Sequence, residues 1–228
     1  MAGGEISMSF RRQLGILNPK EIIFPITVIG VGGIGRAAAE TLAEMGCPKM
    51  TLIDPDKVET HNRPNQVYRK SDIGRLKVEA AKEIIEGFAE WCKIETIAER
   101  FVGQIPLKGI VVSAVDSIET RKEIWQFVHY NVNVPLFIDG RLGGQFMQVF
   151  TVKPCQIEDI ERYEETLFPK ERTAHLPCTA QQIIYVGKII GGLIALQFKK
   201  WLKKESYNLE LALDLADMTL LLDKKLGF

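Results

Sequence analysis

The sequence of 228 residues contains no CxxC pair, although it has four cysteines. These stand singly along the chain, at Cys47, Cys92, Cys155 and Cys178. Four-cysteine zinc sites are built from closely spaced cysteine pairs, so the spacing argues against such a site. It does not suggest a disulfide framework either, and we therefore expect a cytoplasmic protein.

The sequence also lacks an excess of charge of either sign. Lys and Arg together number 29, and so do Asp and Glu. A balanced chain carries no global field that would attract nucleic acid or an anionic membrane surface. We therefore expect a small-molecule or protein substrate and no nucleic-acid partner.

No apolar run is long enough to span a bilayer. The longest weakly polar stretch, 183–198, is interrupted by Lys188, which predicts a buried helix and no membrane partner. The first residues, MAGGEISMSFRRQ, do not show the basic-then-apolar pattern of a secretory signal.

Strand and helix patterns alternate through the first 140 residues, as is typical of a parallel sheet covered by helices. The expected strands cover 25–29, 50–53, 94–101, 110–115 and 136–139, and the expected helices 34–45, 76–91 and 118–130. The prediction is an α/β fold with a doubly wound, mostly parallel, Rossmann-like sheet.

The pattern changes after Gly143-Gly144. Apolar and polar residues alternate over 146–152, which predicts an antiparallel strand. The segment 154–177 has the composition of a loop, a helix is expected over 179–202, and 209–216 resembles an edge strand with 218–222 as its hairpin partner. We treat 1–228 as one domain, with a nucleotide-binding half (1–140) and a partner-binding half (141–228).

A glycine-rich loop follows the first predicted strand, with glycines at Gly30, Gly32, Gly33 and Gly35. Such a loop lets backbone amides approach a phosphate, and the following helix adds positive charge at its N-terminus. The next strand ends at Asp54, whose carboxylate can accept from ribose hydroxyls. The pattern predicts a nucleotide site, and by itself it fits an NAD-dependent oxidoreductase.

Three polar residues further along the chain argue against hydride transfer. Asn62 and Lys77 follow Asp54, and Lys77 stands near a helix start, where the dipole disfavours a cation unless an anion is near. Asp116 ends a buried strand and faces the crevice where such sheets bind ligands. Asp116 can also cap the next helix, with Glu119 completing a capping box, and Asp56 can be a turn former or part of the site.

With these positions, the chain resembles the ATP-dependent activators of ubiquitin-like proteins, the family of the MoeB and ThiF adenylyltransferases. The resemblance runs from Arg12 to the C-terminal helix. Its motifs are GVGGIG (30–35), Asp54-x-Asp56-x-Val58, Asn62, Gln66, Asp72-Ile73-Gly74-x-x-Lys77, and Val115-Asp116 with Arg121. It implies adenylation, with ATP and Mg²⁺, of the C-terminal carboxylate of a small ubiquitin-like or sulfur-carrier protein that ends in Gly-Gly.

The resemblance also implies roles for single residues. Asp54 would hold the ribose, Asn62 and Lys77 the phosphates, and Asp116 the Mg²⁺. Arg12 would reach the phosphates bound by a partner subunit, which implies a homodimer. Cys178 resembles the ThiF cysteine that links to its carrier protein; the alternative is a buried thiol at a helix start.

The chain departs from the family at three places. Asn65 stands where a phosphate-contacting arginine is usual, so Arg63 or Arg69 would have to supply that charge. Arg36 replaces a common serine, and it either neutralises phosphate or points outward. The zinc-binding CxxC pairs of many relatives are missing, so no zinc is expected. Asn65 keeps open a further alternative, a catalytically weak scaffold that binds a ubiquitin-like partner.

Overall fold

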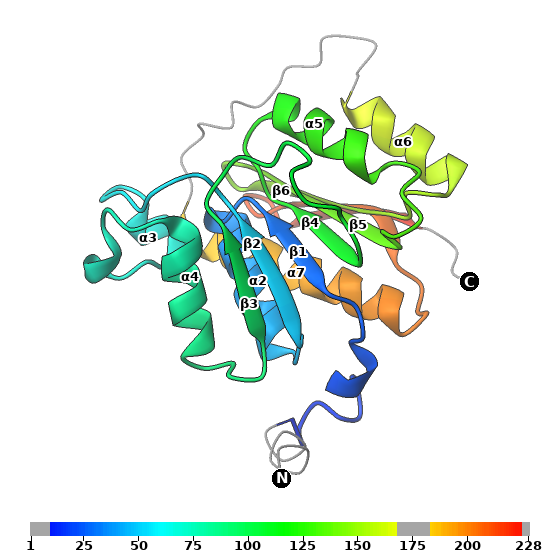
Figure 1. Cartoon of the computed structure of the whole chain (residues 1–228). Helices are drawn as coiled ribbons and strands as arrows, with labels where there is room; N and C mark the ends of the chain where they lie inside the picture. The colour runs from blue at the N-terminus through cyan, green and yellow to red at the C-terminus, as the bar shows by residue number, and fades with distance from the viewer. Residues whose placement is uncertain (1–9, 168–182, 225–228) are drawn as a thin grey trace.

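The structure is a computed structural model that describes residues 10–167 and 183–224 (Figure 1). Its strands are β1 (Ile26–Ile29), β2 (Lys49–Ile53), β3 (Lys93–Ile97), β4 (Ile110–Ser113), β5 (Leu136–Gly143), β6 (Phe146–Val152), β7 (Asn208–Asp214) and β8 (Thr219–Lys224). Its helices are α2 (Gly33–Glu44), α3 (Arg63–Gln66), α4 (Lys77–Glu86), α5 (Ile118–Val128), α6 (Ile157–Leu167) and α7 (Ile184–Leu202), with 3-10 turns η1 (Pro19–Glu21) and η2 (Lys70–Asp72).

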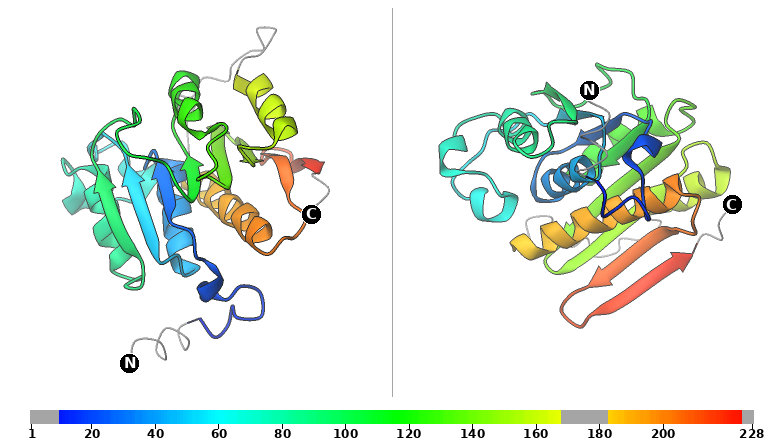
Figure 2. Two further views of the ribbon diagram at one scale, coloured as in Figure 1. Left: turned by 45° about the vertical axis from the view of Figure 1, so that its right-hand side comes forward. Right: turned by 90° about the horizontal axis from the view of Figure 1, so that it is seen from below.

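All eight of these strands form one sheet, in the order β3-β2-β1-β4-β5-β6-β7-β8. The strands from β3 to β5 are parallel, and those from β5 to β8 are antiparallel. This arrangement confirms the predicted fold class, a mostly parallel doubly wound sheet with an antiparallel extension. Figure 2 shows the β7–β8 hairpin at one edge of the sheet.

Helices cover both faces of the sheet, and each face has its own hydrophobic core. One core joins α2, α4 and α7 to the sheet, and the other joins α5 and α6 to the opposite face (Figures 1 and 2). Within β4, Ile110 and Val112 belong to the first core and Val111 to the second. A strand that is buried on both faces explains the continuous apolar run in the sequence.

The segment expected to be a loop, 154–177, contains a helix. In α6, Ile160, Tyr163 and Leu167 are buried at spacings of three and four, and the neighbouring charged side chains are mostly exposed. The prediction was wrong for Ile157–Leu167 because the high charge concealed an apolar stripe of helical period.

Two smaller expectations also needed correction. The hairpin partner predicted over 218–222 is confirmed as β8, but β8 and not β7 is the edge strand. The helix expected over 76–91 is shorter in the structure, where α4 ends at Glu86, and Phe88 lies beyond it and is exposed. The buried apolar side chains of α4 are Val78, Ala80, Ala81 and Ile85.

Helix α7 packs closely on α2, as predicted for a buried helix, and two adjacent glycines of α7 differ in their surroundings. A Cβ added to Gly191 would lie 2.8 Å from backbone and side-chain atoms of Ala37, whereas one added to Gly192 meets nothing within 4 Å. None of the helices in the described ranges is long and apolar enough to cross a membrane.

We expect Gly191→Ala and Gly192→Ala to change stability in opposite directions. Gly191→Ala forces α2 and α7 apart and should lower the free energy of unfolding by about 1–3 kcal/mol. Gly192→Ala removes only backbone freedom and should raise it by about 0.5–1 kcal/mol. Urea denaturation of the two variants measures both values, and equal shifts would contradict the close α2–α7 contact.

Candidate functional site

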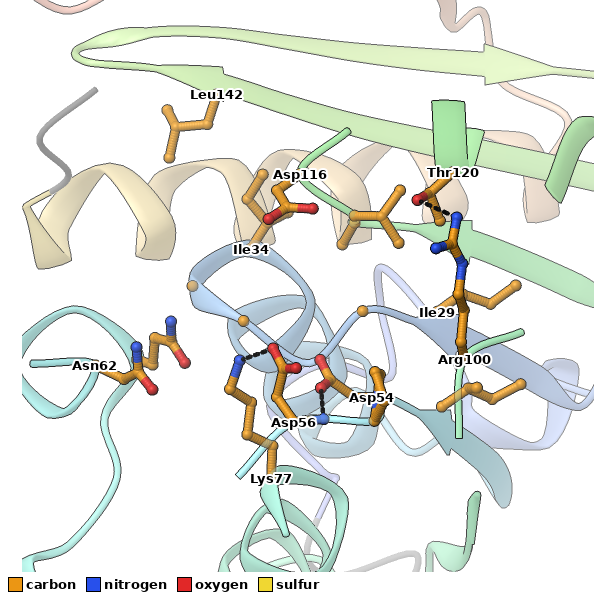
Figure 3. Close-up of a pocket in the computed structure, with 18 of the residues that line it drawn as sticks. Ile29, Ile34, Asp54, Asp56, Asn62, Lys77, Arg100, Asp116, Thr120 and Leu142 are labelled. Carbon is orange, nitrogen blue, oxygen red and sulfur yellow. Dashed lines mark hydrogen bonds and ion pairs between the residues drawn. The ribbon is translucent and has the colours of Figure 1, made fainter. Parts of the chain in front are cut away.

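A pocket of about 680 Å³ opens at the carboxyl ends of the parallel strands (Figure 3). It lies where β1 and β4 are neighbours while their connections lead away in opposite directions, to β2 and to β5. Open α/β sheets bind ligands at such a switch point. The pocket brings together seven of the ten residues predicted for the site, namely Gly30, Gly32, Gly33, Asp54, Asn62, Lys77 and Asp116.

The glycine loop is built by close backbone contacts. Gly30 has a φ of +88°, and a Cβ there would lie 2.7 Å from the carbonyl oxygen of Ala114. Gly35 does not line the pocket, but a Cβ there would lie 1.8 Å from the carbonyl oxygen of Gly30. Gly32 is the N-cap residue of α2, and it has no side chain that could accept hydrogen bonds from the first amides of the helix. These amides are therefore available to an anion.

The carboxylate of Asp54 is hydrogen-bonded to the backbone of the glycine loop. Its Oδ2 accepts a hydrogen bond of 2.6 Å from the amide of Val31, and its Oδ1 accepts one of 2.8 Å from the amide of Asp56. Burial raises the pKa of Asp54, an effect that the charge of Lys77 opposes. Each carboxylate oxygen retains a second acceptor position, so Asp54 can also bind a ribose hydroxyl.

Lys77 is the first residue of α4, and its buried side chain points into the pocket (Figure 3). Its Nζ lies 2.8 Å from Oδ2 of Asp56, whose side chain is 62% exposed. We expected an anion beside Lys77, because the helix dipole disfavours a lone cation at that position. In the structure this anion is the carboxylate of Asp56. Asp56 also lines the pocket, so it belongs to the site and does more than form a turn.

Asp116 does not cap α5, which corrects the predicted capping box. The helix begins one residue later, and the cap is Ser117, whose Oγ accepts a hydrogen bond of 3.1 Å from the amide of Thr120. Asp116 is exposed on the wall of the pocket and makes no hydrogen bond or ion pair with any described residue. Its carboxylate is free to bind a ligand.

The donor set around Asp116 fits a magnesium ion that is shared with phosphates. Within the described ranges, no group of three His, Cys, Asp or Glu residues is placed to hold a metal. Mg²⁺ usually takes one or two protein carboxylates and completes its shell with phosphate oxygens and water. Asp116 alone can therefore supply the protein ligand of such an ion.

Neither arginine expected to replace the missing phosphate contact lies in the pocket. Asn65 lines it, whereas Arg63 and Arg69 do not. Arg69 instead makes ion pairs with Glu83 and Asp72. The expectation that Arg63 or Arg69 supplies this charge is therefore wrong.

Two other arginines line the pocket instead. Arg100 was not predicted because the third strand was expected to continue to residue 101. In the structure β3 ends at Ile97, and Arg100, which follows the strand, lines the pocket. Its Nη2 donates to Glu123 at 2.7 Å. Arg121 was part of the family motif without a stated role, and it is buried, with its Nε donating to Asp139 at 3.0 Å.

Arg36 is neither at the phosphate loop nor directed outward. It is buried, does not line the pocket, forms an ion pair with Glu40 on the next turn of α2, and lies over the ring of Tyr68. Both alternatives for Arg36 are therefore wrong. A serine at this position could not make these contacts.

Of the two remaining candidates, only Arg12 is among the described residues, and it does not line the pocket. Arg12 is exposed, and its neighbour Gln13 donates to the carbonyl of Met45, at the opposite end of α2 from the glycine loop. Arg12 therefore cannot be assigned to the pocket of its own chain. Cys178 lies outside the described residues.

The chain shows sequence similarity to curated proteins of two different activities. It is 33% identical over 141 residues to the tRNA threonylcarbamoyladenosine dehydratase of Escherichia coli, covering 58% of this chain and 50% of that one. It is also 33% identical over 135 residues to the molybdopterin-synthase adenylyltransferase of Haemophilus influenzae, covering 56% and 55%. The chain thus spans about half the length of these relatives.

The fold has counterparts among solved structures, and a family model identifies the chain. The crystal structure of PaaA superposes with a TM-score of 0.76 at 21% identity, covering 97% of this chain and 84% of that chain. At that identity the likeness concerns the fold. The model of the ThiF family matches residues 24–222, from the strand before the glycine loop to the last hairpin, and the chain therefore belongs to the ThiF family.

Proposed function

We propose that this protein adenylates the C-terminal carboxylate of a small ubiquitin-like or sulfur-carrier protein ending in Gly-Gly, with ATP and Mg²⁺. The observation that carries the proposal is that one pocket joins the glycine loop, Lys77 and the unpaired carboxylate of Asp116. A protein acceptor is supported by the relative named molybdopterin-synthase adenylyltransferase.

The proposed reaction is a displacement at the α-phosphorus of ATP. An oxygen of the acceptor carboxylate bonds to this phosphorus, and the bond to the oxygen that bridges to the β-phosphate breaks. Pyrophosphate leaves with that electron pair, and the product is an acyl-adenylate. The acceptor is already ionised at neutral pH, so the site must supply positioning and charge stabilisation instead of a general base.

The described residues can meet these two needs. Asp54 orients the ribose, while the amides at the start of α2, Lys77 and Asn62 bind the phosphates. Asp116 would hold Mg²⁺, whose charge stabilises the phosphates when it is bound. Arg12, which lies far from its own pocket, would complete the pocket of a second copy in a homodimer.

The partner-binding half offers a surface suited to a protein acceptor. The edge strand β8 exposes Leu220, Leu221 and Leu222 side by side in the sequence. Consecutive exposed leucines on a sheet edge are typical of an interaction site and are unfavourable in contact with water. This supports an acceptor that docks on the half of the chain from 141 to 228.

ATP–pyrophosphate exchange tests the proposal. Labelled pyrophosphate should enter ATP when the protein, Mg²⁺-ATP and a carrier ending in Gly-Gly are mixed, and not when the carrier lacks its last glycine. A thermal-shift comparison of Mg²⁺-ATP with NAD tests the oxidoreductase alternative, which predicts stabilisation by NAD. Binding of ATP without exchange, with every carrier tried, would favour the scaffold that Asn65 suggested.

A further inference from the structure

Tyr68 does not line the pocket, but its hydroxyl contacts the glycine loop and the start of α4, which do. It follows α3, and the preceding Val67 turns the chain back toward the core with a φ of 58°. The Tyr68 side chain is 5% exposed and belongs to the core on the α2–α4 face of the sheet. A buried phenol needs a hydrogen-bond partner, and the partners of Tyr68 are both backbone carbonyls of the site.

The hydroxyl of Tyr68 connects two parts of the site. It donates to the carbonyl of Val31 in the glycine loop at 2.9 Å, and the carbonyl of Lys77 at the start of α4 lies 3.4 Å away. Burial raises the pKa of Tyr68, so the hydroxyl keeps its proton and remains a donor at neutral pH. One group thus fixes the separation between the loop and the helix that carries Lys77.

Val31 is held at both of its polar backbone atoms. Its amide donates to Asp54, and its carbonyl accepts from Tyr68. Gly32 and Gly33, which line the pocket, follow directly. The direction of their amides therefore depends on how firmly Val31 is held.

The ring of Tyr68 is itself fixed by a chain of charged groups. The guanidinium carbon of Arg36 lies 5.3 Å from the ring centroid, and Arg36 pairs with Glu40, which pairs with Lys188 of α7. A cation over the face of a tyrosine attracts the ring. The buried Arg36, which does not line the pocket, thus contacts the ring of the residue that donates to the glycine loop.

We propose that Tyr68 is a positioning residue for the phosphates, and that its hydroxyl holds the glycine loop in the orientation that receives them. This inference rests on the proposed function only in taking a nucleotide as the ligand of the pocket. Tyr68 touches neither the nucleotide nor the acceptor, so its effect must be carried by the loop. The Tyr68 hydroxyl makes no hydrogen bond with Asp54, the residue proposed to hold the ribose.

Tyr68→Phe tests the inference, because it removes the hydroxyl and keeps the ring under Arg36. Binding of Mg²⁺-ATP and of adenosine should be measured by calorimetry on the full chain. We expect the dissociation constant of ATP to rise about tenfold, as for a lost hydrogen bond to a buried group, and that of adenosine to stay within twofold. In exchange assays the KM for ATP should rise with it.

Tyr207→Phe is the matched control. Tyr207 is also buried, and its hydroxyl has no hydrogen-bond partner in the described part of the chain, so its removal should change neither dissociation constant. An equal loss of ATP and adenosine binding in Tyr68→Phe would indicate general loosening and overturn the inference. Unchanged ATP binding would overturn it as well.

The outcome separates this inference from the proposed function. If the wild-type protein binds ATP but catalyses no exchange, the adenylation proposal fails, and the Tyr68→Phe comparison still decides by binding alone. If the wild-type protein binds no ATP, the positioning role of Tyr68 is overturned together with the nucleotide site.

Discussion

Asp116→Asn should lower the rate of ATP–pyrophosphate exchange by about 10²- to 10³-fold, the usual loss when one preorganised charge-stabilising group is removed from an active site. The amide has the same size but no negative charge, so it is a poor ligand for Mg²⁺ beside the phosphates. Because Ser117 and not Asp116 caps α5, the stability of the protein should not change. Exchange kinetics and a thermal melt on the same preparation measure both quantities.

Glu119→Gln is the control for this prediction. Glu119 is an exposed acid in the first turn of the same helix, and it does not line the pocket. Glu119→Gln is the same acid-to-amide change, and the exchange rate of this variant should match that of the wild type. Near-normal exchange by Asp116→Asn would remove Asp116 from the mechanism.

Lys77→Met and Asp56→Asn should change the affinity for ATP in opposite directions. Lys77→Met removes a charged phosphate donor, and the dissociation constant should rise about 10- to 100-fold. Asp56→Asn releases Nζ of Lys77 from its 2.8 Å ion pair and removes a negative charge from the pocket. The affinity should then improve by about two- to fivefold, the equivalent of a weak surface ion pair.

Equilibrium titration with Mg²⁺-ATP measures both effects. Lys82→Met provides the control, since Lys82 lies on the same helix but does not line the pocket. If Asp56→Asn weakens binding as strongly as Lys77→Met does, Asp56 is itself a ligand of the nucleotide-bound metal. In that case Asp56 does not compete with the phosphates for Lys77.

The parts of the fold that the sequence predicts well are those with a single physical cause. The strand before Gly30, the start of α2 and the strand that ends at Asp54 follow from the need for close backbone contacts and from continuous apolar runs. Because parallel strands end at one edge of the sheet, the order of the strands along the chain is enough to place Asp54 and Asp116 in one pocket.

The expectations that failed depended on where an element ends. A difference of one residue moved the cap of α5 from Asp116 to Ser117, and an early end of β3 brought Arg100 into the pocket. The ends of helices and strands fray and vary by one or two residues, so sequence patterns place them poorly. The high charge of α6 and the single turn of α3 hid two further elements.

The position of Arg36 could not be predicted for a different reason. Its contacts with Glu40 and Tyr68 come from α2 and from the segment after α3, which are brought together only by tertiary packing. The glycine motif indicated that a cation near the helix start would meet phosphate or solvent. A third possibility, a buried cation stacked on an aromatic ring, requires knowledge of the neighbouring segment.

The continuous sheet also sets the distance between β8 and the nucleotide pocket. From β8 to the crevice between β4 and β1 the order runs through β7, β6 and β5, which at the usual strand spacing is a path of about 20 Å. An extended peptide advances about 3.3 Å per residue. A carrier protein docked at β8 would therefore need a tail of about six extended residues before its terminal carboxylate reached the nucleotide, and carriers with shorter tails would dock without reacting.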